Sequence, residues 1–293
     1  MEQIALDEAA EIFTQARRRL FGIAYRMLGT VSDAEDLLQE VWLRWQAADR
    51  TTVHNPIAYL STTTSRLAIN ATKTAYARHE TYAGPWLPEP VDTSADPQLG
   101  AERGAALELA VLMLMEKLPP HERAAYVLRE AFDYPYREIA EIIRTTEATA
   151  RQWVTRARKH LAEDRRAPVA PSERQRLLNG FLAAAQAGDI AGLEELLADE
   201  VVSYSDSGGT SSNAARVPLY GAATVAAAVV GFASKVWRDV SAEPVTVNGQ
   251  YALRLRQQGA VFAVLSIDAS DDGITQVLWQ VNPAKIEGAG SWT

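Results

Sequence analysis

The spacing of apolar positions predicts helices through most of the first 80 residues. Apolar side chains of residues 13–27 share one helical face, and Gly29 follows as a natural helix end. The segment 32–35 has the form of a capping box, and the apolar side chains of residues 38–45 then recur at i, i+3, i+4 and i+7. Asn55 and Pro56 supply an N-cap and a first-turn proline, so a third helix is expected to begin there.

Proline and glycine divide the rest of the chain. Residues 84–100 hold four prolines and two glycines and are typical of a linker, and residues 167–173 form a second one. After two further helical patterns come strand-like runs at 201–205, 260–268 and 273–281. We therefore expect a multidomain chain with two all-α domains followed by an α+β domain. The expected boundaries are 1–80, 81–105 for the linker, 106–166 and 172–293.

The segment 136–160 predicts a helix-turn-helix. A short amphipathic helix begins at Tyr136, Arg144 lies in the turn, and Thr146 with Glu147 caps a second helix that runs to about His160. On the second helix one face is apolar (Ala150, Val154, Ala157, Leu161) and another is polar (Arg151, Gln152, Thr155, Lys159). Arginine and glutamine can read base edges in the major groove, so the polar face is typical of a recognition helix. A plain pair of packed helices is the alternative.

The charge distribution supports DNA binding by that helix in particular. The whole chain carries a net charge of −8, which by itself argues against a nucleic-acid partner. Residues 144–160, however, contain five basic residues against one acidic residue, whereas residues 172–293 contain eight against thirteen. A single basic helix therefore lies within an acidic protein.

Two further surface patterns have both a functional and an ordinary interpretation. Asp33, Asp36 and Glu40 share one helical face, and such a stripe is usually only solvated surface. Tyr59, Thr63, Arg66 and Asn70 share a face of the third expected helix, where an aromatic ring and a base could stack on and neutralise single-stranded DNA. Neither pattern supports a function when taken alone.

Composition excludes several chemistries and sets the expected location. The chain has no cysteine, which excludes disulfides, zinc sites with thiolate ligands and cysteine nucleophiles. The acidic N-terminus does not have the form of a signal peptide, and no apolar run is long enough to cross a bilayer. We expect a cytoplasmic protein that does not contact a membrane, with no cofactor and no metal.

Three spaced segments resemble a known family. Residues 19–45, residues 55–70 and the segments within 118–161 are similar, in the same order, to bacterial sigma factors of the extracytoplasmic-function type. The first two match the promoter-melting and core-binding region 2, and the last matches region 4. The resemblance covers roughly residues 1–165 and implies two partners, core RNA polymerase and promoter DNA.

The resemblance also assigns roles to the surface patterns. It makes the acidic stripe a candidate contact for RNA polymerase (Asp33, Asp36, Glu40) and the face on the third helix a candidate contact for the −10 element (Tyr59, Arg66, Asn70). The recognition helix becomes the candidate reader of the −35 element, with these residues on bases and phosphates: Arg151, Gln152, Thr155, Arg156, Arg158 and Lys159. Arg144 stands where such turns commonly have glycine, so the turn either holds it at positive φ or adopts another geometry.

The C-terminal residues resemble a subgroup of these sigma factors that carries a fused SnoaL-like domain. The segments 84–90, 204–210 and 281–286 are similar to its three markers. The resemblance implies an α+β cone in which helices pack on a curved antiparallel sheet. The chain departs from the markers at Ser207, at Thr210, and after Asn282-Pro283, where the usual acidic residue is absent.

For this last domain we weigh regulation against catalysis. In the regulatory interpretation it packs on region 2 and the linker, through an interface that includes Trp86, Leu87, Asp206, Asn282, Pro283 and Lys285. In the catalytic one, Asp206 or Asp268 transfers a proton in an apolar pocket. Regulation is favoured, because no histidine follows His160 and Asp206 lies in a Ser/Gly loop. A small ligand of this domain and a helix-turn-helix repressor stay open as alternatives, and we expect a monomer that is not an enzyme.

Overall fold

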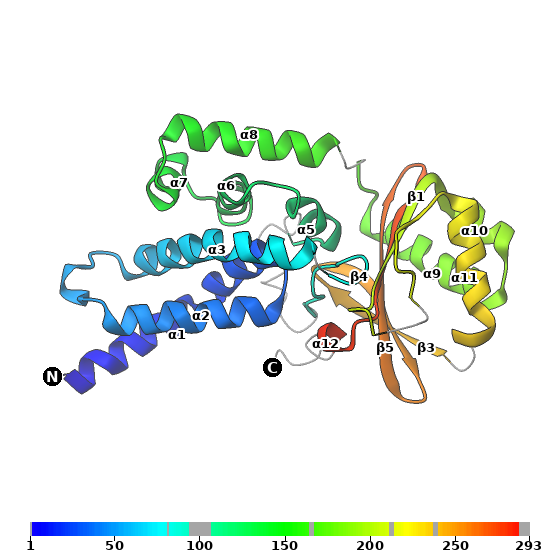
Figure 1. The fold of residues 1–293 in the computed structure, drawn as a ribbon, viewed down its shortest axis with the longest axis horizontal. Helices are drawn as coiled ribbons and strands as arrows, with labels where there is room; N and C mark the ends of the chain where they lie inside the picture. Colours follow the sequence, from blue (N-terminus) through cyan, green and yellow to red (C-terminus); the bar gives the residue numbers. More distant parts are fainter. Residues whose placement is uncertain are drawn as a thin grey trace. The chain divides into compact units, whose positions relative to one another are not determined.

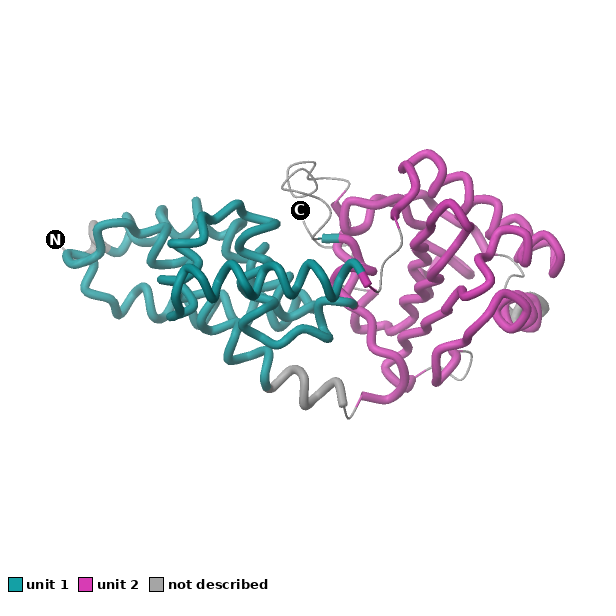
Figure 2. Tube along the Cα trace, turned by 90° about the horizontal axis from the view of Figure 1, so that it is seen from above, with its two compact units in different colours: residues 1–80, 102–107, 114–162 teal, residues 81–101, 108–113, 163–293 magenta. Residues whose placement is uncertain are grey.

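The structure is a computed structural model that describes residues 2–80, 82–93, 107–163, 167–210, 214–236 and 240–286. The chain divides into two compact units (Figure 2). Unit 1 contains residues 1–80, 102–107 and 114–162, and unit 2 contains residues 81–101, 108–113 and 163–293. The described part of the expected linker, 82–93, thus belongs to the unit that holds the C-terminal domain, and its end at 94–105 lies outside the described residues.

Unit 1 is helical. Its α-helices are, in chain order, α1 (Glu2–Leu28), α2 (Val31–Ala47), α3 (Pro56–Glu80), α6 (Pro120–Glu130), α7 (Tyr136–Ile143) and α8 (Glu147–Glu163), with a short 3₁₀ helix, η1 (Arg50–Thr52), after α2 (Figure 1). A further helix, α5 (Leu109–Met115), spans the boundary between the two units. Helices α1, α2 and α3 pack on one another, α6 packs on α1 and α3, and α7 packs on α3 and α6.

The N-cap of α3 is the predicted residue, whereas the N-cap of α2 is not. The Asn55 side chain accepts a hydrogen bond from the backbone N–H of Ala58 (3.0 Å) at the start of α3, as predicted. The N-cap of α2, however, is Thr30, whose hydroxyl accepts from the N–H of Asp33 (3.3 Å), so the expectation of a cap at Ser32 was wrong. Gly29, at φ 76, turns the chain so sharply after α1 that the next residue already takes the capping conformation.

The predicted apolar faces form the core of unit 1. Leu38, Val41 and Trp45 on α2 are buried, and the Trp45 indole N–H donates to the carbonyl of Ala9 (3.0 Å). On α8 the buried residues are Ala150, Val154, Ala157 and Leu161, as the helix-turn-helix pattern predicts. A buried arginine also joins α1 to α6, since the Arg123 guanidinium donates to the carbonyl of Arg26 (3.1 Å).

Unit 2 is an α+β domain, which confirms the expected fold class. Its helices are α9 (Pro171–Ala187), α10 (Ile190–Leu196), α11 (Ala222–Val236) and α12 (Pro283–Ile286). Its strands are β1 (Leu197–Asp206), β2 (Leu219–Tyr220), β3 (Val240–Val247), β4 (Gln250–Gln257), β5 (Ala260–Ser270) and β6 (Gly273–Gln280). They form one sheet in the order β2-β1-β6-β5-β4-β3.

The sheet is mixed, whereas an antiparallel one was expected. β1 pairs with β6 in parallel, for example Tyr204 with Leu278 and Asp206 with Gln280, while the other neighbouring pairs are antiparallel. Parallel neighbours need a long connection, and the chain between β1 and β6 supplies one because it contains α11 and four further strands. The consequence is that the ends of β1 and β6, at Asp206 and Gln280, lie side by side.

The two faces of the sheet are covered differently. Helices α9, α10 and α11 lie on one side of it (Figure 1), where Leu178, Phe181 and Leu193 pack against Leu265 and Val277 in the main hydrophobic core of this unit. Because side chains alternate along a strand, the neighbours of those core residues on β4, β5 and β6 point to the opposite face. Leu87 and Pro88 of the linker lie on that opposite face, beside Val264 and Leu278.

Candidate functional site

The residues predicted to read the −35 element are all exposed on α8. The list is Arg151, Gln152, Thr155, Arg156, Arg158 and Lys159. Three of the arginines form ion pairs, Arg151 with Glu147 (2.9 Å), Arg156 with Glu122 (3.6 Å) and Arg158 with Glu130 (2.7 Å). Because the arginine members are more than half exposed, these pairs are weak and can be exchanged for contacts with DNA.

The turn before α8 holds Arg144 in the left-handed conformation. Its φ and ψ are 56° and 58°, and its N–H donates to the carbonyl of Ala140 as the C-cap of α7. The structure therefore takes the first of the two alternatives that the sequence left open. A non-glycine residue in this conformation costs about 1–2 kcal/mol, so the turn stores strain.

The face of α3 predicted to contact the −10 element is already in contact with other side chains and carbonyls of unit 1. The Tyr59 ring packs on Trp45, with ring centroids 5.5 Å apart, and Asn70 is exposed. The Arg66 guanidinium donates to the carbonyls of Ile142 (2.8 Å) and Glu141 (3.0 Å) at the C-terminal end of α7. Burial and the charge of Arg144 lower the pKa of Arg66. This contact with α7 could not be anticipated from the sequence, because the partners are backbone groups 75 and 76 residues away.

The acidic stripe on α2 borders a small groove. Asp33, Asp36 and Glu40 line a hollow of about 210 Å³ together with apolar side chains of α1, α2 and α3 (Leu28, Leu37, Leu67, Ala71). Asp36 and Glu40 are exposed, and Glu40 accepts a hydrogen bond from Arg44 (2.6 Å). Carboxylates around an apolar floor suit a partner that offers basic side chains with apolar stems.

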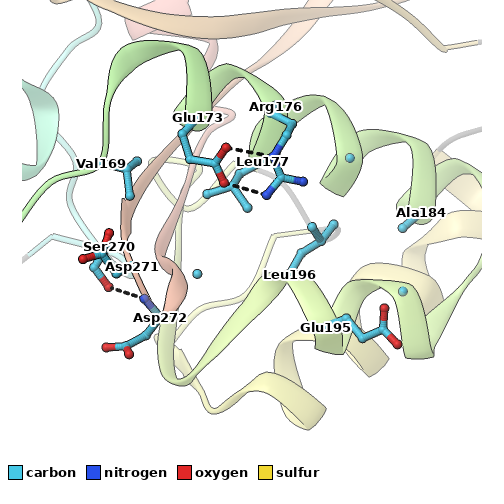
Figure 3. Close-up of a pocket in the computed structure, with 13 residues that line it drawn as sticks. Val169, Glu173, Arg176, Leu177, Ala184, Glu195, Leu196, Ser270, Asp271 and Asp272 are labelled. Atoms are coloured by element: carbon cyan, nitrogen blue, oxygen red, sulfur yellow. Dashed lines mark hydrogen bonds and ion pairs between the residues drawn. The ribbon is translucent and has the colours of Figure 1, made fainter.

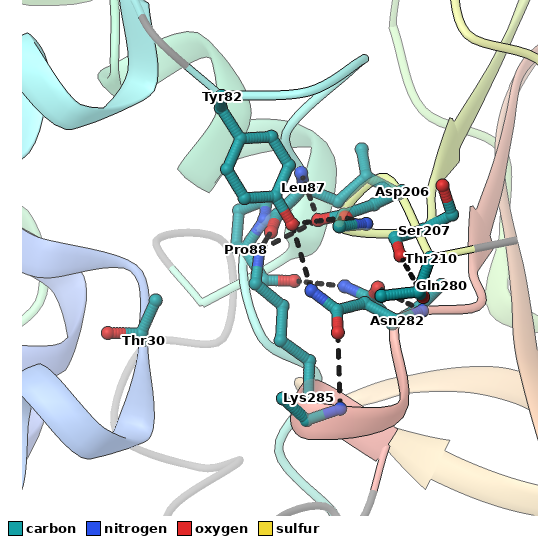
Figure 4. Close-up of polar contacts among 12 residues, drawn as sticks. Thr30, Tyr82, Leu87, Pro88, Asp206, Ser207, Thr210, Gln280, Asn282 and Lys285 are labelled. Carbon is teal, nitrogen blue, oxygen red and sulfur yellow. Dashed lines mark hydrogen bonds and ion pairs between the residues drawn. The ribbon is translucent and has the colours of Figure 1, made fainter.

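The linker is held against the C-terminal domain by a buried ion pair. Asp206, at the end of β1, is fully buried, and its carboxylate lies 2.7 Å from the ammonium group of Lys285 on α12 (Figure 4). Between them they bind one peptide unit on each side of Leu87: the Leu87 N–H donates to Asp206 (2.9 Å), and the Leu87 carbonyl accepts from Lys285 (2.5 Å). Leu87 itself is 2% exposed.

Aromatic and amide groups complete this pair. The Lys285 ammonium lies 4.5 Å from the centre of the Trp86 ring and 5.3 Å from that of the Tyr82 ring. The Tyr82 hydroxyl donates to Asp206 (2.6 Å) and accepts from the Asn282 side-chain amide (2.9 Å). Burial and the contact with Asp206 raise the pKa of Tyr82 well above its ordinary value, so this hydroxyl keeps its proton.

The loop after β1 adds a backbone hydrogen bond to the Asp206 carboxylate. The N–H of Gly208 donates to Asp206 (3.1 Å), and Gly208 and Gly209 both have positive φ. A Cβ on Gly208 would lie 2.7 Å from the Asn282 side chain, so a larger residue here would push on the amide that bonds Tyr82. Thr210, a departure from the family pattern, instead closes the turn by donating to the carbonyl of Ser207 (2.6 Å).

Farther along, the linker pairs with the edge of the sheet. Val91 donates to the Asn248 side chain and its carbonyl accepts from the Asn248 N–H, both at 2.9 Å, while Thr93 N–H donates to the carbonyl of Thr246 on β3 (2.8 Å). Gln280 donates to the carbonyl of Pro88 (3.3 Å), and Asp92 forms an ion pair with Arg254 (3.0 Å).

The structure thus brings together five of the six residues predicted for an interdomain interface. Trp86, Leu87, Asp206, Asn282 and Lys285 share the contacts above, and Pro283 is exposed at the first position of α12. Sequence reasoning missed Tyr82, Gln280 and Asn248. A signal was present only for Asn248, since the dipeptide Asn248-Gly249 marks a hairpin turn between two strands.

Both carboxylates considered for proton transfer are held in ion pairs. Asp206 is paired with Lys285, and Asp268 lies 3.4 Å from the guanidinium of Arg174, with both side chains at most 10% exposed. Among the described residues there is no group of three or more acidic or histidine side chains placed to bind a metal ion. In the same part of the chain, no helix is both long and apolar enough to cross a membrane.

Comparison with known proteins identifies the sigma segments. Residues 12–78 match the family model Sigma-70 region 2, and residues 108–161 match Sigma-70, region 4. The chain is 38% identical over 212 residues to the ECF RNA polymerase sigma factor SigJ of Mycobacterium tuberculosis, which covers 70% of this chain and 67% of that protein. It is 29% identical over 285 residues to the probable ECF RNA polymerase sigma factor SigI of the same species, or 96% of each chain.

A solved structure extends the similarity over both units. The crystal structure of the Mycobacterium tuberculosis extracytoplasmic function sigma factor SigJ superimposes with a TM-score of 0.77 at 30% identity, covering 96% of this chain and 99% of that one. Two sigma domains in the expected order and relatives that match most of the chain leave one assignment. The chain belongs to the ECF RNA polymerase sigma factors, which direct transcription initiation.

Proposed function

We propose that this sigma factor, which interacts with core RNA polymerase and promoter DNA as its family does, is restrained by its own C-terminal domain. The observation that carries the proposal is the linker: the Leu87 peptide groups are bound between Asp206 and Lys285, and Leu87 is buried. The linker joins the segment matched to region 2 to that matched to region 4, so fixing it to the C-terminal domain limits how far the two regions can separate. Residues 1–80, 81–105, 106–166 and 172–293 then act as the −10 and polymerase module, the linker, the −35 module and the restraint.

We propose that core RNA polymerase binds at the groove bordered by the acidic stripe on α2. Asp33, Asp36 and Glu40 contact a basic surface of the polymerase, where rim charges chiefly set the association rate and its dependence on salt. The double variant Asp36→Lys with Glu40→Lys should weaken holoenzyme assembly in a titration of core polymerase. Glu194→Lys with Asp199→Lys, on exposed side chains of unit 2, makes the same change in net charge and serves as the control. Equal affinity for both variants would return the stripe to ordinary surface.

We propose that α8 contacts the −35 element of the promoter, and that the face of α3 with Tyr59, Arg66 and Asn70 contacts the −10 element. Arg66 donates to the carbonyls at the end of α7, so a DNA phosphate has to compete with those carbonyls for the same guanidinium. This competition supports a restrained state in which the −10 face is partly occupied.

In vitro transcription with core polymerase tests the restraint. The full chain is compared with a chain that ends before Asn282, which lacks the Lys285 ammonium, and with a 1–170 fragment. Removal from Asn282 should raise initiation from the cognate promoter. The 1–170 fragment shows whether the rest of the domain also supports region 2, since its activity then falls below that of the shorter truncation. Equal initiation by the full chain and the chain ending before Asn282 would contradict the restraint.

The ion pairs of Asp206 and Asp268 support a structural role for the two carboxylates, so we propose that the C-terminal domain is not a catalyst. We also propose that the chain acts as a monomer.

A further inference from the structure

The helix side of the sheet in unit 2 is the first place to consider for a small-molecule site. On the helix side of the sheet, Phe181, Leu193 and Val277 are fully buried in the hydrophobic core, and Trp279 packs against it. This side is filled with apolar side chains, as protein interiors are. A small molecule would have to displace part of the core to bind there.

A second candidate is a hollow on the outside of the helices. It measures about 720 Å³ and lies over α9, α10 and the turn between β5 and β6 (Figure 3). Its charged groups include Glu195, Asp271 and Asp272, and its arginine, Arg176, already forms an ion pair with Glu173 (2.6 Å). The hollow is wide and lined by acidic groups, and it does not distinguish one cationic ligand from another.

The face that holds the linker is different, because it forms hydrogen bonds with successive backbone groups of the bound segment. Within the described part of the linker, residues 82–93, six backbone groups are hydrogen-bonded to the C-terminal domain, namely the N–H and carbonyl of Leu87, the carbonyl of Pro88, the N–H and carbonyl of Val91, and the N–H of Thr93. Their partners are Asp206, Lys285, Gln280, Asn248 and the Thr246 carbonyl. Such an array of main-chain contacts is how proteins bind extended peptides.

Side-chain selection on this face comes from an apolar pocket and an ion pair. Leu87 and Pro88 are buried beside Val264, Leu278 and the α5 residue Leu109, with about 10 Å³ left over. The prolines at 88 and 90 suit an extended segment, since proline restricts the chain to that conformation in advance. Asp92 adds a charge contact with Arg254. The pattern selected is therefore Leu-Pro, two further residues, and then Val-Asp-Thr.

We propose that this face is a peptide-binding site for which the linker is the internal ligand, and that a partner protein's extended, proline-containing segment of the same pattern displaces the linker. The inference rests on the proposed restraint, because displacement matters only if the docked linker limits initiation. It names the class of signal, an unfolded Leu-Pro segment of another protein.

Because the linker is covalently attached to the domain that binds it, a segment of a different protein is a better candidate for displacing it than the linker of a second copy. The linker is joined to the unit that binds it, so its effective concentration is about millimolar. The same segment from another copy has no better contacts and is present at far lower concentration. A partner wins only with a segment that improves on the linker, and the small space beside Leu87 is one place where it can do so.

The experiment uses the full chain and a labelled synthetic peptide with the sequence of residues 84–93, GPWLPEPVDT. The receptor is the Leu87→Asp chain. In it the linker no longer fits the apolar pocket, while the residues of the binding face are unchanged. Fluorescence anisotropy should show saturable binding to this chain, with an affinity about tenfold or more above that for the wild-type chain, where the linker competes. The same peptide with aspartate in place of its leucine is the control, and it should not bind.

Two further measurements test the peptide site without relying on the Leu87→Asp variant alone. In the wild-type chain, unlabelled peptide at millimolar concentration should increase hydrogen exchange at Val91 and Thr93, whose N–H groups are bonded in the docked state. Adding Gln280→Ala to the Leu87→Asp chain should weaken peptide binding about fivefold, the effect of one hydrogen bond. Binding that does not saturate, equal binding of both peptides, or unchanged exchange in the wild-type chain would overturn the proposal.

Transcription separates this inference from the proposed function. If the peptide binds without changing initiation, the site stands and the restraint fails. If the Leu87→Asp chain initiates more strongly than wild type but binds no peptide, the restraint stands and the peptide site is wrong. Sedimentation of the wild-type chain should show a monomer at about 1–100 µM, because the internal ligand wins at these concentrations. A dimer that the Leu87→Asp variant abolishes would assign the site to a second copy and overturn the choice of a partner protein.

Discussion

Replacing the buried pair Asp206 and Lys285 tests whether it holds the linker. Breaking a buried ion pair by removing one partner costs about 3–5 kcal/mol, because the remaining charge is left uncompensated. The two sides differ here. In Lys285→Met, Asp206 keeps three donors, the Tyr82 hydroxyl (2.6 Å) and the N–H groups of Leu87 (2.9 Å) and Gly208 (3.1 Å). We therefore expect a loss at the low end of that range, about 3 kcal/mol.

The carboxylate variant should cost more. In Asp206→Asn, the Lys285 ammonium loses its counter-ion and keeps the Leu87 carbonyl and two aromatic rings. The amide also replaces one of the two carboxylate oxygens with an NH₂ group, which then faces the N–H of either Leu87 or Gly208, so we expect a loss near 5 kcal/mol. The double variant carries neither charge, and its loss should be smaller than the sum of the two by about 1–3 kcal/mol.

Urea unfolding of the full chain, with hydrogen exchange of segments from β1, β6 and the linker, measures these losses in unit 2. Equal denaturant dependence in all four proteins is the condition for comparing them. Losses that add without coupling would show that the two charges do not act as a pair. A larger loss in Lys285→Met than in Asp206→Asn would refute the argument from the three donors.

Three other predictions concern single side chains. The raised pKa of Tyr82 means that the folded state favours the neutral hydroxyl; its contribution is present below the ordinary tyrosine value of about 10 and is lost as the pH rises above it. The urea midpoint of unit 2 should therefore fall between about pH 10 and 11 in wild type and fall less in Tyr82→Phe. Arg144→Gly should stabilise unit 1 by about 1 kcal/mol, seen as a higher Tm, because glycine takes the left-handed conformation without strain; Arg144→Ala, which keeps the strain, should not. Across promoter variants, Arg151→Ala should relax one −35 position at a cost of about 1–3 kcal/mol, whereas Lys159→Ala should weaken binding to all sequences alike; identical uniform losses would show that the two faces are wrongly assigned.

Local sequence signals predicted the helix-turn-helix well. The cap at Thr146, the buried stripe through Val154 and the exposed face with Arg151 each depend on residues a few positions apart, and the structure has all three. Strand β3, which contains Pro244, was not among the runs expected as strands. Proline is tolerated there because β3 is an edge strand, and that position follows only from the strand order.

The contacts of the candidate site were harder to predict because they join distant parts of the chain. The sequence identified Trp86, Asp206 and Lys285 through the family markers, without indicating how they meet. Parallel pairing of β1 with β6 brings Asp206 beside Gln280, and no local pattern encodes that register. The contact of Arg66 with α7 is of the same kind, since a backbone carbonyl has no signature in the sequence.

The pairing of the linker with β3 also affects the solubility of the released state. An edge strand with open N–H and carbonyl groups is a template for pairing with other chains, and β3 carries the apolar residues Val245 and Val247, both buried in the docked form. When Thr93 leaves the Thr246 carbonyl, that edge becomes available for aggregation. Glu243 and Pro244 on the same strand oppose such pairing, since a charge and a missing N–H both disfavour it. The released chain is therefore least prone to aggregate when another protein covers the β3 edge as soon as the linker leaves it. This favours release of the linker while the chain is bound to polymerase or to a displacing partner over release in free solution.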